Sequence, residues 1–388
     1  MKQRYNLVGT FVTAALLAAC SGTSNGLSPS TPTSAGTSGS HAHRQANGPD
    51  SLGGAFLYVA NSTSDNVSAY KINPKNGALT SVSGSPFTAG SGSVAVAVVG
   101  SFAYVVNQNY PRSKGSIDAY TINRESGVLT PVNRTFRTGA SPYAIAVDQN
   151  DFVYAPNIFS NNVSAYTINP NNGALKTIAG SPFSTCCQPE GVTVDPEANV
   201  VYVTNTETND VSAYTANPIS GALTELPGSP YGAGTTPEQP AVDPTGRFLY
   251  VPNTNSNNIS IYKIKQSGGS LQEITGSPFA TGTNPYDVAV DPAAKYAYVV
   301  LGGDNSVAAY HINPQSGALT EVAGSPFAAG TGPLELTVAL SRFVYVTNDG
   351  SNNVSAYEIN ERNGALKPLA GSPFSAGAGP RGVAAYTP

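Results

Sequence analysis

From residue 56 to the C-terminus, short runs of alternating apolar and polar residues recur, and each run stops at Asn, Gly or Pro. The runs are about four to eight residues long and rich in Val, Thr and Tyr, which is the pattern of half-buried β-strands. A sustained 3.6-residue period, the pattern of an amphipathic helix, occurs nowhere in the chain. The pattern therefore predicts an all-β protein with few helices.

One aromatic strand motif marks each copy of a repeat. It reads VYVTN from Val201 and again from Val344, with close variants in the other copies. The tyrosine of the motif stands at Tyr58, Tyr104, Tyr154, Tyr202, Tyr250, Tyr298 and Tyr345, so that successive copies are 46 to 50 residues apart. Four strand-like runs fill each copy, and this period is typical of the blades of a β-propeller. We therefore expect one seven-bladed β-propeller of four-stranded antiparallel blades, although a length of 388 residues alone suggests two or three domains.

The two ends of the repeated region predict how the propeller closes. The first copy begins at its second strand, at Phe56, whereas the last copy is followed by an additional first strand, GPRGVAAY, from Gly379 to Tyr386. If this C-terminal strand pairs with the first blade, every blade has four strands and the ring leaves no large open sheet edge. A parallel β-solenoid, the alternative architecture, would need no such complementary ends.

Residues that recur in every copy are expected to serve packing, because a residue repeated seven times is not a single catalytic centre. A second tyrosine recurs at Tyr70, Tyr120, Tyr166, Tyr214, Tyr262, Tyr310 and Tyr357, and the turn GSPF occurs five times. The second copy departs from this turn and reads NRTFRTG at residues 133–139. Aspartates open the turns that follow several first strands, where a short carboxylate caps the backbone: Asp148, Asp195, Asp243 and Asp291.

The first 52 residues have a different composition from the repeats. Lys2 and Arg4 precede an apolar run at residues 7–19, which is too short to span a bilayer, so we expect a signal peptide at 1–19. The run ends in LAAC, which resembles the lipobox of bacterial lipoproteins and implies lipidation of Cys20; an ordinary signal peptide with a chance cysteine is the alternative. Residues 20–52 are expected to be a flexible tether rich in Ser, Thr and Gly, with the propeller at 53–388.

These features predict a lipid-anchored, extracytoplasmic protein of the bacterial cell envelope, at the outer membrane or the periplasmic face, where Ser21 after the lipobox favours the outer membrane. Charged residues make up 11% of the chain, the net charge is -4, and Lys and Arg form no cluster, which argues against nucleic-acid binding. We expect a monomer that contacts the membrane through its lipid alone. No cofactor is expected, and no metal, because the aspartates of the turns lie in different blades and His41 and His43 lie in the tether.

If the repeated residues form the scaffold, the candidates for function lie where the copies differ. The first strand of each blade lines the central channel, and its starting residues in chain order are Ser93, Tyr143, Glu190, Glu238, Tyr286, Leu334 and Arg381. The positions that follow add Gln239, Asp287 and Glu335. We expect a polar, partly acidic cup at the channel mouth, suited to a sugar, a peptide end or a cation, made of Tyr143, Glu190, Glu238, Gln239, Tyr286, Asp287, Glu335 and Arg381. A solvated mouth that binds only water is the alternative.

Cys186 and Cys187 are adjacent and are the free thiols that remain once Cys20 is lipidated. In an oxidising compartment we expect a disulfide between these two neighbours. A catalytic thiol would need a nearby base. The one histidine of the repeats, His311, lies on a third strand, far from the channel, so a Ser-His-Asp triad has no credible histidine.

The VYVTN motif, its period and the segment GALTxxxGSPF together resemble the YVTN-repeat β-propellers of the lactonase-like superfamily, over residues 55–388. The resemblance implies a seven-bladed β-propeller. This superfamily includes 6-phosphogluconolactonases and muconate cycloisomerase-like enzymes. In its enzymatic branch GPRH begins a first strand and NEL follows the second strand of that blade, which implies a lactone held by Arg and His with Glu as acid and base.

The chain departs from this enzymatic pattern. GPR occurs at Gly379–Arg381, but Gly382 stands where the histidine is expected, and the matching NEL position reads Asn61-Ser62-Thr63. The main functional prediction is therefore a membrane-tethered propeller that binds an envelope protein or a small carbohydrate-like ligand at its channel mouth. The alternative is a divergent lactonase using Glu190, Glu238 and Arg381. A perturbed carboxylate pair across the mouth would favour the enzyme, and a broad uncharged rim would favour the binding protein.

Overall fold

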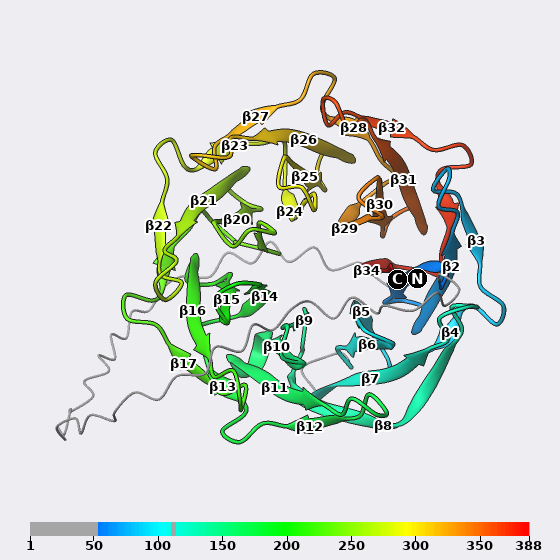
Figure 1. Cartoon of the computed structure of the whole chain (residues 1–388), viewed down its shortest axis with the longest axis horizontal. Coiled ribbons are helices and arrows are strands. Elements are labelled where there is room, and N and C mark those ends of the chain that lie inside the picture. The colour runs from blue at the N-terminus through cyan, green and yellow to red at the C-terminus, as the bar shows by residue number, and fades with distance from the viewer. Residues whose placement is uncertain (1–52, 110–113, 388) are drawn as a thin grey trace, which may run out of the picture. The chain divides into compact units, whose positions relative to one another are not determined.

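The computed structural model describes residues 53–109 and 114–387, and it arranges seven antiparallel sheets as blades around a central channel (Figure 1). The predicted seven-bladed propeller is confirmed, with six sheets of five strands and one of four. Within the described residues the helical content is one 3₁₀ turn, η1 at Ile158–Ser160. Across the same residues no helix has the length and apolar character that crossing a membrane requires. The predicted signal peptide, Cys20 and the tether lie outside the described residues.

In six blades the strands run from the channel outwards in chain order, and in the first blade the innermost strand is the C-terminal one. The first strands, which line the channel, are β34 (Pro380–Tyr386), β5 (Ser93–Val99), β9 (Ala146–Val147), β14 (Pro189–Asp195), β19 (Ala241–Val242), β24 (Pro285–Val290) and β29 (Pro333–Ala339). The second strands are β1 (Ala55–Asn61), β6 (Phe102–Asn107), β10 (Phe152–Asn157), β15 (Val200–Asn205), β20 (Phe248–Asn253), β25 (Tyr296–Leu301) and β30 (Phe343–Asn348).

The third and outer strands complete the blades. The third strands are β2 (Asn66–Ile72), β7 (Lys114–Ile122), β11 (Asn162–Ile168), β16 (Asp210–Ala216), β21 (Asn258–Ile264), β26 (Ser306–Ile312) and β31 (Asn353–Ile359). The outer strands are β3 (Leu79–Ser81), β8 (Leu129–Ala140), β12 (Leu175–Thr177), β17 (Leu223–Glu225), β22 (Leu271–Glu273), β27 (Leu319–Glu321) and β32 (Leu366–Pro368). Short strands that pair with the third strands are β4 (Phe87–Thr88), β13 (Phe183–Ser184), β18 (Tyr231–Gly232), β23 (Phe279–Ala280), β28 (Phe327–Ala328) and β33 (Phe374–Ser375).

The second blade shows what the GSPF turn does. In six blades the outer edge is broken into two pieces, an outer strand and a short strand separated by the GSPF or GSPY turn. The second blade has NRTFRTG in place of this turn, and its outer strand β8 continues without a break over 12 residues. The departure seen in the sequence therefore changes the edge of one blade and leaves the ring intact.

The ring closes as the ends of the chain predict. The C-terminal strand β34 pairs antiparallel with β1, with Phe56 opposite Tyr386 and Asn61 opposite Pro380. The closed blade then has the order β3-β2-β1-β34. The two ends of the propeller therefore share one sheet, and the blade of β1 has an innermost strand like the others.

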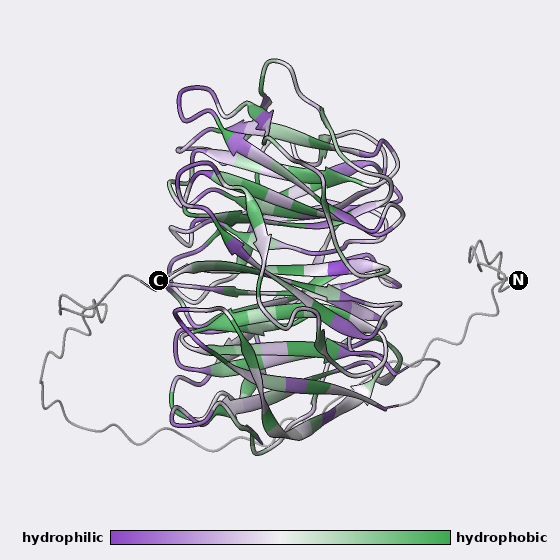
Figure 2. Cartoon of the chain, turned by 90° about the vertical axis from the view of Figure 1, so that its right-hand side faces the viewer, coloured by the Kyte–Doolittle hydropathy of each residue, from purple (hydrophilic) through white to green (hydrophobic). Residues whose placement is uncertain are grey.

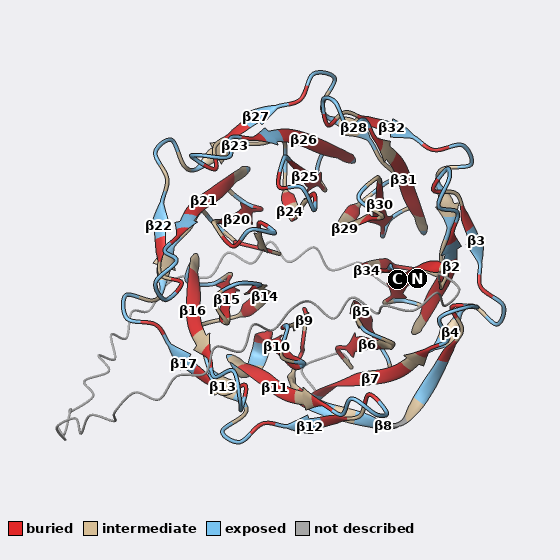
Figure 3. Cartoon of the chain, viewed as in Figure 1, coloured by how far each residue is buried: buried red, intermediate tan, exposed pale blue. Residues whose placement is uncertain are grey.

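The repeated tyrosines hold neighbouring blades together, which confirms that they serve packing. Each tyrosine of the second strands is buried and donates its hydroxyl to a glycine carbonyl of the next blade, from Tyr58 to Gly127 (2.9 Å) round to Tyr345 and Gly77 (2.7 Å). On the third strands, donors to carbonyls of the preceding blade are Tyr70, Tyr120, Tyr166, Tyr214, Tyr262 and Tyr357. The apolar residues of the inner strands are buried in clusters that join neighbouring blades, and these strands are coloured as buried in Figure 3 and largely as hydrophobic in Figure 2.

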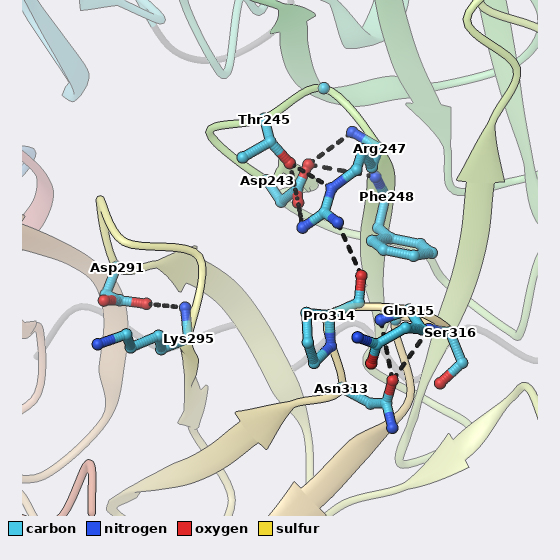
Figure 4. A network of polar contacts seen from close by, with 12 residues as sticks. Asp243, Thr245, Arg247, Phe248, Asp291, Lys295, Asn313, Pro314, Gln315 and Ser316 are labelled. Atoms are coloured by element: carbon cyan, nitrogen blue, oxygen red, sulfur yellow. Dashed lines mark hydrogen bonds and ion pairs between the residues drawn. The ribbon is translucent and has the colours of Figure 1, made fainter. Parts of the chain in front are cut away.

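At the end of the channel where the first strands finish, the predicted capping aspartates are confirmed. Asp243 accepts hydrogen bonds from the backbone N–H groups of Arg247 (2.7 Å) and Phe248 (3.2 Å), and Thr245 donates its hydroxyl to the other carboxylate oxygen (2.8 Å; Figure 4). Asp291 accepts in the same way from the N–H of Lys295 (2.6 Å). Each carboxylate is bonded within its own turn, so these residues belong to the scaffold.

Candidate functional site

The candidate site lies at the opposite end, where the first strands begin. There the first residue of a first strand pairs with the last residue of the second strand, as Pro189 does with Asn205. A β-bulge follows, with register shifts between Pro189 and Val192 and at the same place in β24 and β29. A bulge sets two residues opposite one on the partner strand. Two consecutive residues can therefore face the channel. This explains why Tyr286, the first residue after its proline, and Gln239, the second residue after its proline, line the same cavity.

All seven blades contribute a residue to this mouth. The structure corrects the sequence prediction at one of them, the blade of Ser93. Ser93 does not face the channel: it pairs with Asn107 in the position that proline holds elsewhere, is fully buried, and its Oγ lies 2.9 Å from Asn107 Oδ1. Val94, the next residue, takes the channel-facing position. The comparison of the copies placed Ser93 at the channel because the first strand of this blade lacks the proline that marks the register in the other blades.

The mouth encloses a cavity of about 10 Å³, lined by Val94, Tyr143, Glu238, Gln239, Tyr286, Leu334, Glu335 and Arg381. Six of these are among the eight predicted cup residues. A second cavity, of about 190 Å³, lies further along the channel and is lined mainly by apolar residues together with Gln239, Asp287 and Glu335. Because Gln239 and Glu335 border both cavities, they form a polar partition across the channel.

Arg381 supplies the positive charge of the mouth. Its guanidinium donates a hydrogen bond to the Tyr143 hydroxyl (3.1 Å), and its Cζ atom lies 5.3 Å from the centroid of the Tyr143 ring. This contact joins residues two blades apart in the ring. Burial raises the pKa of the Tyr143 phenol well above its usual value, so the phenol is neutral and its hydroxyl remains a hydrogen-bond donor.

Glu190 and Glu238, from neighbouring blades, form a pair of carboxyls whose pKa values are both raised. Burial raises the pKa of Glu238 well above its usual range, and the negative charge of Glu190 and the hydrogen bond between the two carboxyls raise it further. Burial also raises the pKa of Glu190, but hydrogen bonds with Glu238 and Thr206 and the charge of Arg381 oppose that shift. Glu238, which is 6% exposed, therefore holds the proton, and Glu190 is the member that ionises first.

Asp287 and Glu335 form a second pair beneath the first. Burial raises the pKa of Asp287 to about 7, against the effect of the Leu336 N–H, which donates to Asp287 Oδ2 (2.8 Å). Burial and the charge of Asp287 raise the pKa of Glu335 well above its usual range, while the Val383 N–H donates to Glu335 Oε2 (3.3 Å). The charge of Arg381 acts on Glu190, Glu238 and Glu335, whereas Asp287 acts on Glu335. Strong mutual repulsion means that these four carboxyls cannot all be ionised at once.

Two threonines, which the sequence prediction did not single out, position the mouth. Thr204 Oγ1 accepts a hydrogen bond from the Gly191 N–H (2.8 Å) and donates to the Glu238 carbonyl in the next blade (2.9 Å). Thr347 makes the matching contact with the Arg381 carbonyl (2.5 Å). The signal was present in the sequence, because the two copies that read VYVTN carry threonine at this position.

The structure explains why the family's histidine is missing. A Cβ atom on Gly382 would lie 2.5 Å from Ala95 Cα and 2.8 Å from the Val94 carbonyl oxygen, both in the backbone of the neighbouring blade. No side chain fits there unless the two strands move apart. Ser62, in the position of the family's glutamate, lies beside the strand of Arg381, as predicted, and its Oγ is 3.0 Å from the Gly379 carbonyl oxygen.

The other candidate residues, Cys186, Cys187 and His311, do not line the mouth cavity. Cys186 and Cys187 are free thiols with their Sγ atoms 3.6 Å apart, so the disulfide is not formed in this structure, and its formation under oxidising conditions stays a prediction. His311 is exposed on β26 and meets the Tyr296 ring edge-on, as expected of a surface residue. In the part of the chain that the structure describes, no group of three or more His, Cys, Asp or Glu side chains is placed to hold a metal ion.

Fold and site together define a seven-bladed propeller with a buried acidic cluster and one arginine at its channel mouth. The family model of the lactonase, seven-bladed β-propeller family matches residues 144–237 and 234–339. The chain therefore belongs to this family. No curated protein sequence matches the chain.

Solved structures share the fold at low sequence identity. A protein of Bacteroides uniformis, described provisionally as a 6-phosphogluconolactonase, is 19% identical, with a TM-score of 0.76 over 87% of this chain and 100% of the other. The periplasmic gluconolactonase of Pseudomonas aeruginosa is 18% identical, with a TM-score of 0.71 over 86% of this chain and 99% of the other. At such identities the likeness shows the fold alone.

Proposed function

We propose that this protein hydrolyses a lactone at its channel mouth, with Glu190 and Glu238 as base and acid and Arg381 polarising the lactone carbonyl. The observation that carries the proposal is the pair of buried carboxyls, Glu190 and Glu238, whose pKa values are raised beside a single guanidinium. Such a pair was the feature that, from the sequence, would favour the enzyme over the binding protein. Membership of the lactonase family, and the activities named for two structural neighbours, support the same choice.

The pair suits both halves of the reaction. The ionised Glu190 takes a proton from water as the water oxygen attacks the carbonyl carbon, and Arg381 stabilises the developing oxyanion. Glu238 then gives its proton to the ring oxygen as the carbon–oxygen bond breaks. The product is a hydroxy acid whose carboxyl releases a proton, and the proton now on Glu190 returns to Glu238 across their hydrogen bond.

The cavity can hold a water molecule beside Glu238 and Arg381. A volume of about 10 Å³ is close to the least that one water molecule needs, and Tyr143, Glu238, Gln239, Glu335 and Arg381 give it polar walls. The lactone would lie above this cavity, at the open mouth, with its carbonyl towards Arg381. The family's histidine and glutamate are replaced by Gly382 and Ser62, so the acid and base come from other blades.

The experiment is a hydrolysis assay on the purified full-length chain with sugar lactones, phosphorylated sugar lactones and muconolactones. We expect a rate above that of buffer which falls by at least about tenfold in Arg381→Ala, because the charge at the carbonyl is lost. Arg362→Ala, which changes an exposed arginine in a turn, is the matched control and should keep the full rate. A folded protein that hydrolyses none of these lactones would overturn the proposal. The binding function predicted from the sequence would then be the better interpretation of the mouth.

We also propose, from the sequence alone, that the chain acts outside the cytoplasm as a lipid-anchored protein of the cell envelope. Cys20 is the predicted lipid-bearing residue. Mass spectrometry of the membrane fraction should find the chain beginning at a lipid-modified Cys20, and Cys20→Ala should abolish the modification. An unmodified N-terminus in the expressing bacterium would rule out the anchor without bearing on the hydrolase.

A further inference from the structure

We infer that the substrate of this site is an uncharged, polyhydroxylated lactone and that a phosphorylated lactone is rejected. The inference rests on the proposed function, because it names the substrate class for the same site. Three observations support the inference: the charges around the mouth, the unpaired donor Gln239 Nε2 inside the mouth, and the rings of Tyr143 and Tyr286 in its wall.

The charge balance inside the mouth leaves no cation for a phosphate group. The mouth and the cavity beneath it hold four carboxyls, those of Glu190, Glu238, Asp287 and Glu335, and one guanidinium, that of Arg381, whose charge acts on the three glutamates. Even with one proton on each pair, two carboxylates remain against one positive charge. Phosphate is recognised by arginine clusters or by several backbone N–H groups aimed at one point. Arg381 instead already interacts with Tyr143 and with the carboxyls.

The hairpins around the mouth add negative charge. They join the second and third strands of each blade and emerge beside the starts of the first strands. Their described residues include four carboxylates and no lysine or arginine: Asp65, Glu207, Asp304 and Asp349. Lys114 and Arg137, on β7 and β8, place two cations at the same end of one blade. A dianionic substrate would therefore approach a predominantly negative rim, which lowers its local concentration.

The same side chains are suited to hydroxyl groups. Gln239 Nε2 is buried and has no hydrogen-bond partner among the described residues, and an unpaired buried donor is costly until an acceptor reaches it. Carboxylates accept hydrogen bonds from sugar hydroxyls, and the neutral Tyr143 hydroxyl can donate one. The rings of Tyr143 and Tyr286 line the cavity and offer apolar faces to the C–H groups of a sugar ring.

The test compares glucono-δ-lactone with its 6-phosphate, using the purified full-length chain at low and at high salt. We expect kcat/KM to be at least about tenfold higher for the uncharged lactone at low salt, with the gap narrowing as salt screens the rim. Asp349→Lys and Glu207→Lys, both exposed and outside the cavity, should narrow the gap by about two- to threefold. Glu273→Lys, on the outer strand β22, is the matched control and should leave the ratio unchanged.

A binding measurement tests the preference for an uncharged ligand separately from the proposed hydrolysis. Gluconolactam and its 6-phosphate, which the site cannot hydrolyse as lactones, are titrated calorimetrically into the same protein. Tighter binding of the uncharged lactam without any lactone hydrolysis would support this inference and overturn the hydrolase. Equal or faster hydrolysis of the phosphorylated lactone would overturn the inference and leave the hydrolase standing. Neither binding nor hydrolysis would overturn both.

Discussion

Both ends of the channel carry acidic residues on the same strands, but in opposite surroundings. Where the first strands end, the carboxylate of Asp243 accepts hydrogen bonds from two backbone N–H groups of its own turn, and Arg247 lies 3.7 Å away (Figure 4). Where they begin, the carboxyl of Glu238 meets the carboxyl of Glu190. Asp243, whose acceptors are occupied by backbone donors of its own turn, serves as a cap, whereas Glu238, which faces another carboxyl, has a raised pKa.

The difference teaches where chemistry can arise in a repeated fold. The capping aspartates recur in four blades, where each accepts hydrogen bonds from the backbone N–H groups of its own turn. The mouth residues differ from blade to blade, so unlike groups from several blades can meet, such as Arg381 and Tyr143. We therefore expect substitutions at the two ends to separate cleanly, with catalysis lost at the mouth and stability lost at the caps.

The largest expected effect is on catalysis at the mouth. Glu238→Gln keeps the size and a hydrogen bond but removes the proton that the proposed mechanism gives to the ring oxygen. We expect kcat for the uncharged lactone to fall by about 100-fold or more, with the free energy of unfolding at neutral pH unchanged or raised. Glu273→Gln, an exposed glutamate of the same blade, should match the unchanged protein. Full activity of Glu238→Gln would exclude this residue as the acid.

The converse effect is expected at the caps. Asp243→Ala leaves the N–H groups of Arg247 and Phe248 without their acceptor, so the free energy of unfolding should fall by about 2–3 kcal/mol. The kcat of the molecules that remain folded should not change. Urea denaturation measures the loss, and Asp349→Ala, an exposed residue of a hairpin, should stay within about 0.5 kcal/mol. A loss of kcat in folded Asp243→Ala would show that the capping end of the channel also contributes to catalysis.

A smaller effect tests how tightly the mouth is packed. Gly382→Ala places a Cβ atom 2.5 Å from Ala95 Cα, so we expect a loss of about 1–3 kcal/mol by denaturation. Gly232→Ala is the matched control, because its Cβ would meet nothing within 4 Å. If the two variants were equally stable, the close approach of β34 and β5 would not explain the missing histidine.

The fold was predictable because each level of the sequence points to the same answer. The alternation gives strands, the period gives blades, and the lone strand from Gly379 to Tyr386 has one unpaired partner, the first blade. The channel-facing positions followed from the propeller itself. This is why Glu238, Tyr286 and Arg381 could be named without a structure.

The details of the site were not predictable, for physical reasons. Whether a carboxyl keeps its proton depends on its burial and on side-chain distances between neighbouring blades, which no local pattern encodes. The register at Ser93 was misjudged because a serine that bonds to Asn107 replaces the usual proline. The clash at Gly382 depends on how closely two blades approach. Each of these properties arises from contacts between residues far apart in the chain.

The smallest effect that we predict is the dependence of stability on pH. Asp287 has a pKa of about 7 in the folded protein against about 3.9 when unfolded, so the folded state binds more protons between these values. The free energy of unfolding should therefore fall as pH rises from about 4 to about 7. Asp287→Asn does not titrate, and its oxygen can still accept the Leu336 N–H. Between pH 5 and pH 8 the variant should lose roughly 1 kcal/mol less than the unchanged protein, because Glu335 takes over part of the titration. Urea denaturation at the two pH values measures this difference, with the exposed Asp349→Asn as control. Equal losses in all three proteins would mean that Asp287 does not titrate in this pH range, and the contrast between the two ends of the channel would rest on Glu190 and Glu238 alone.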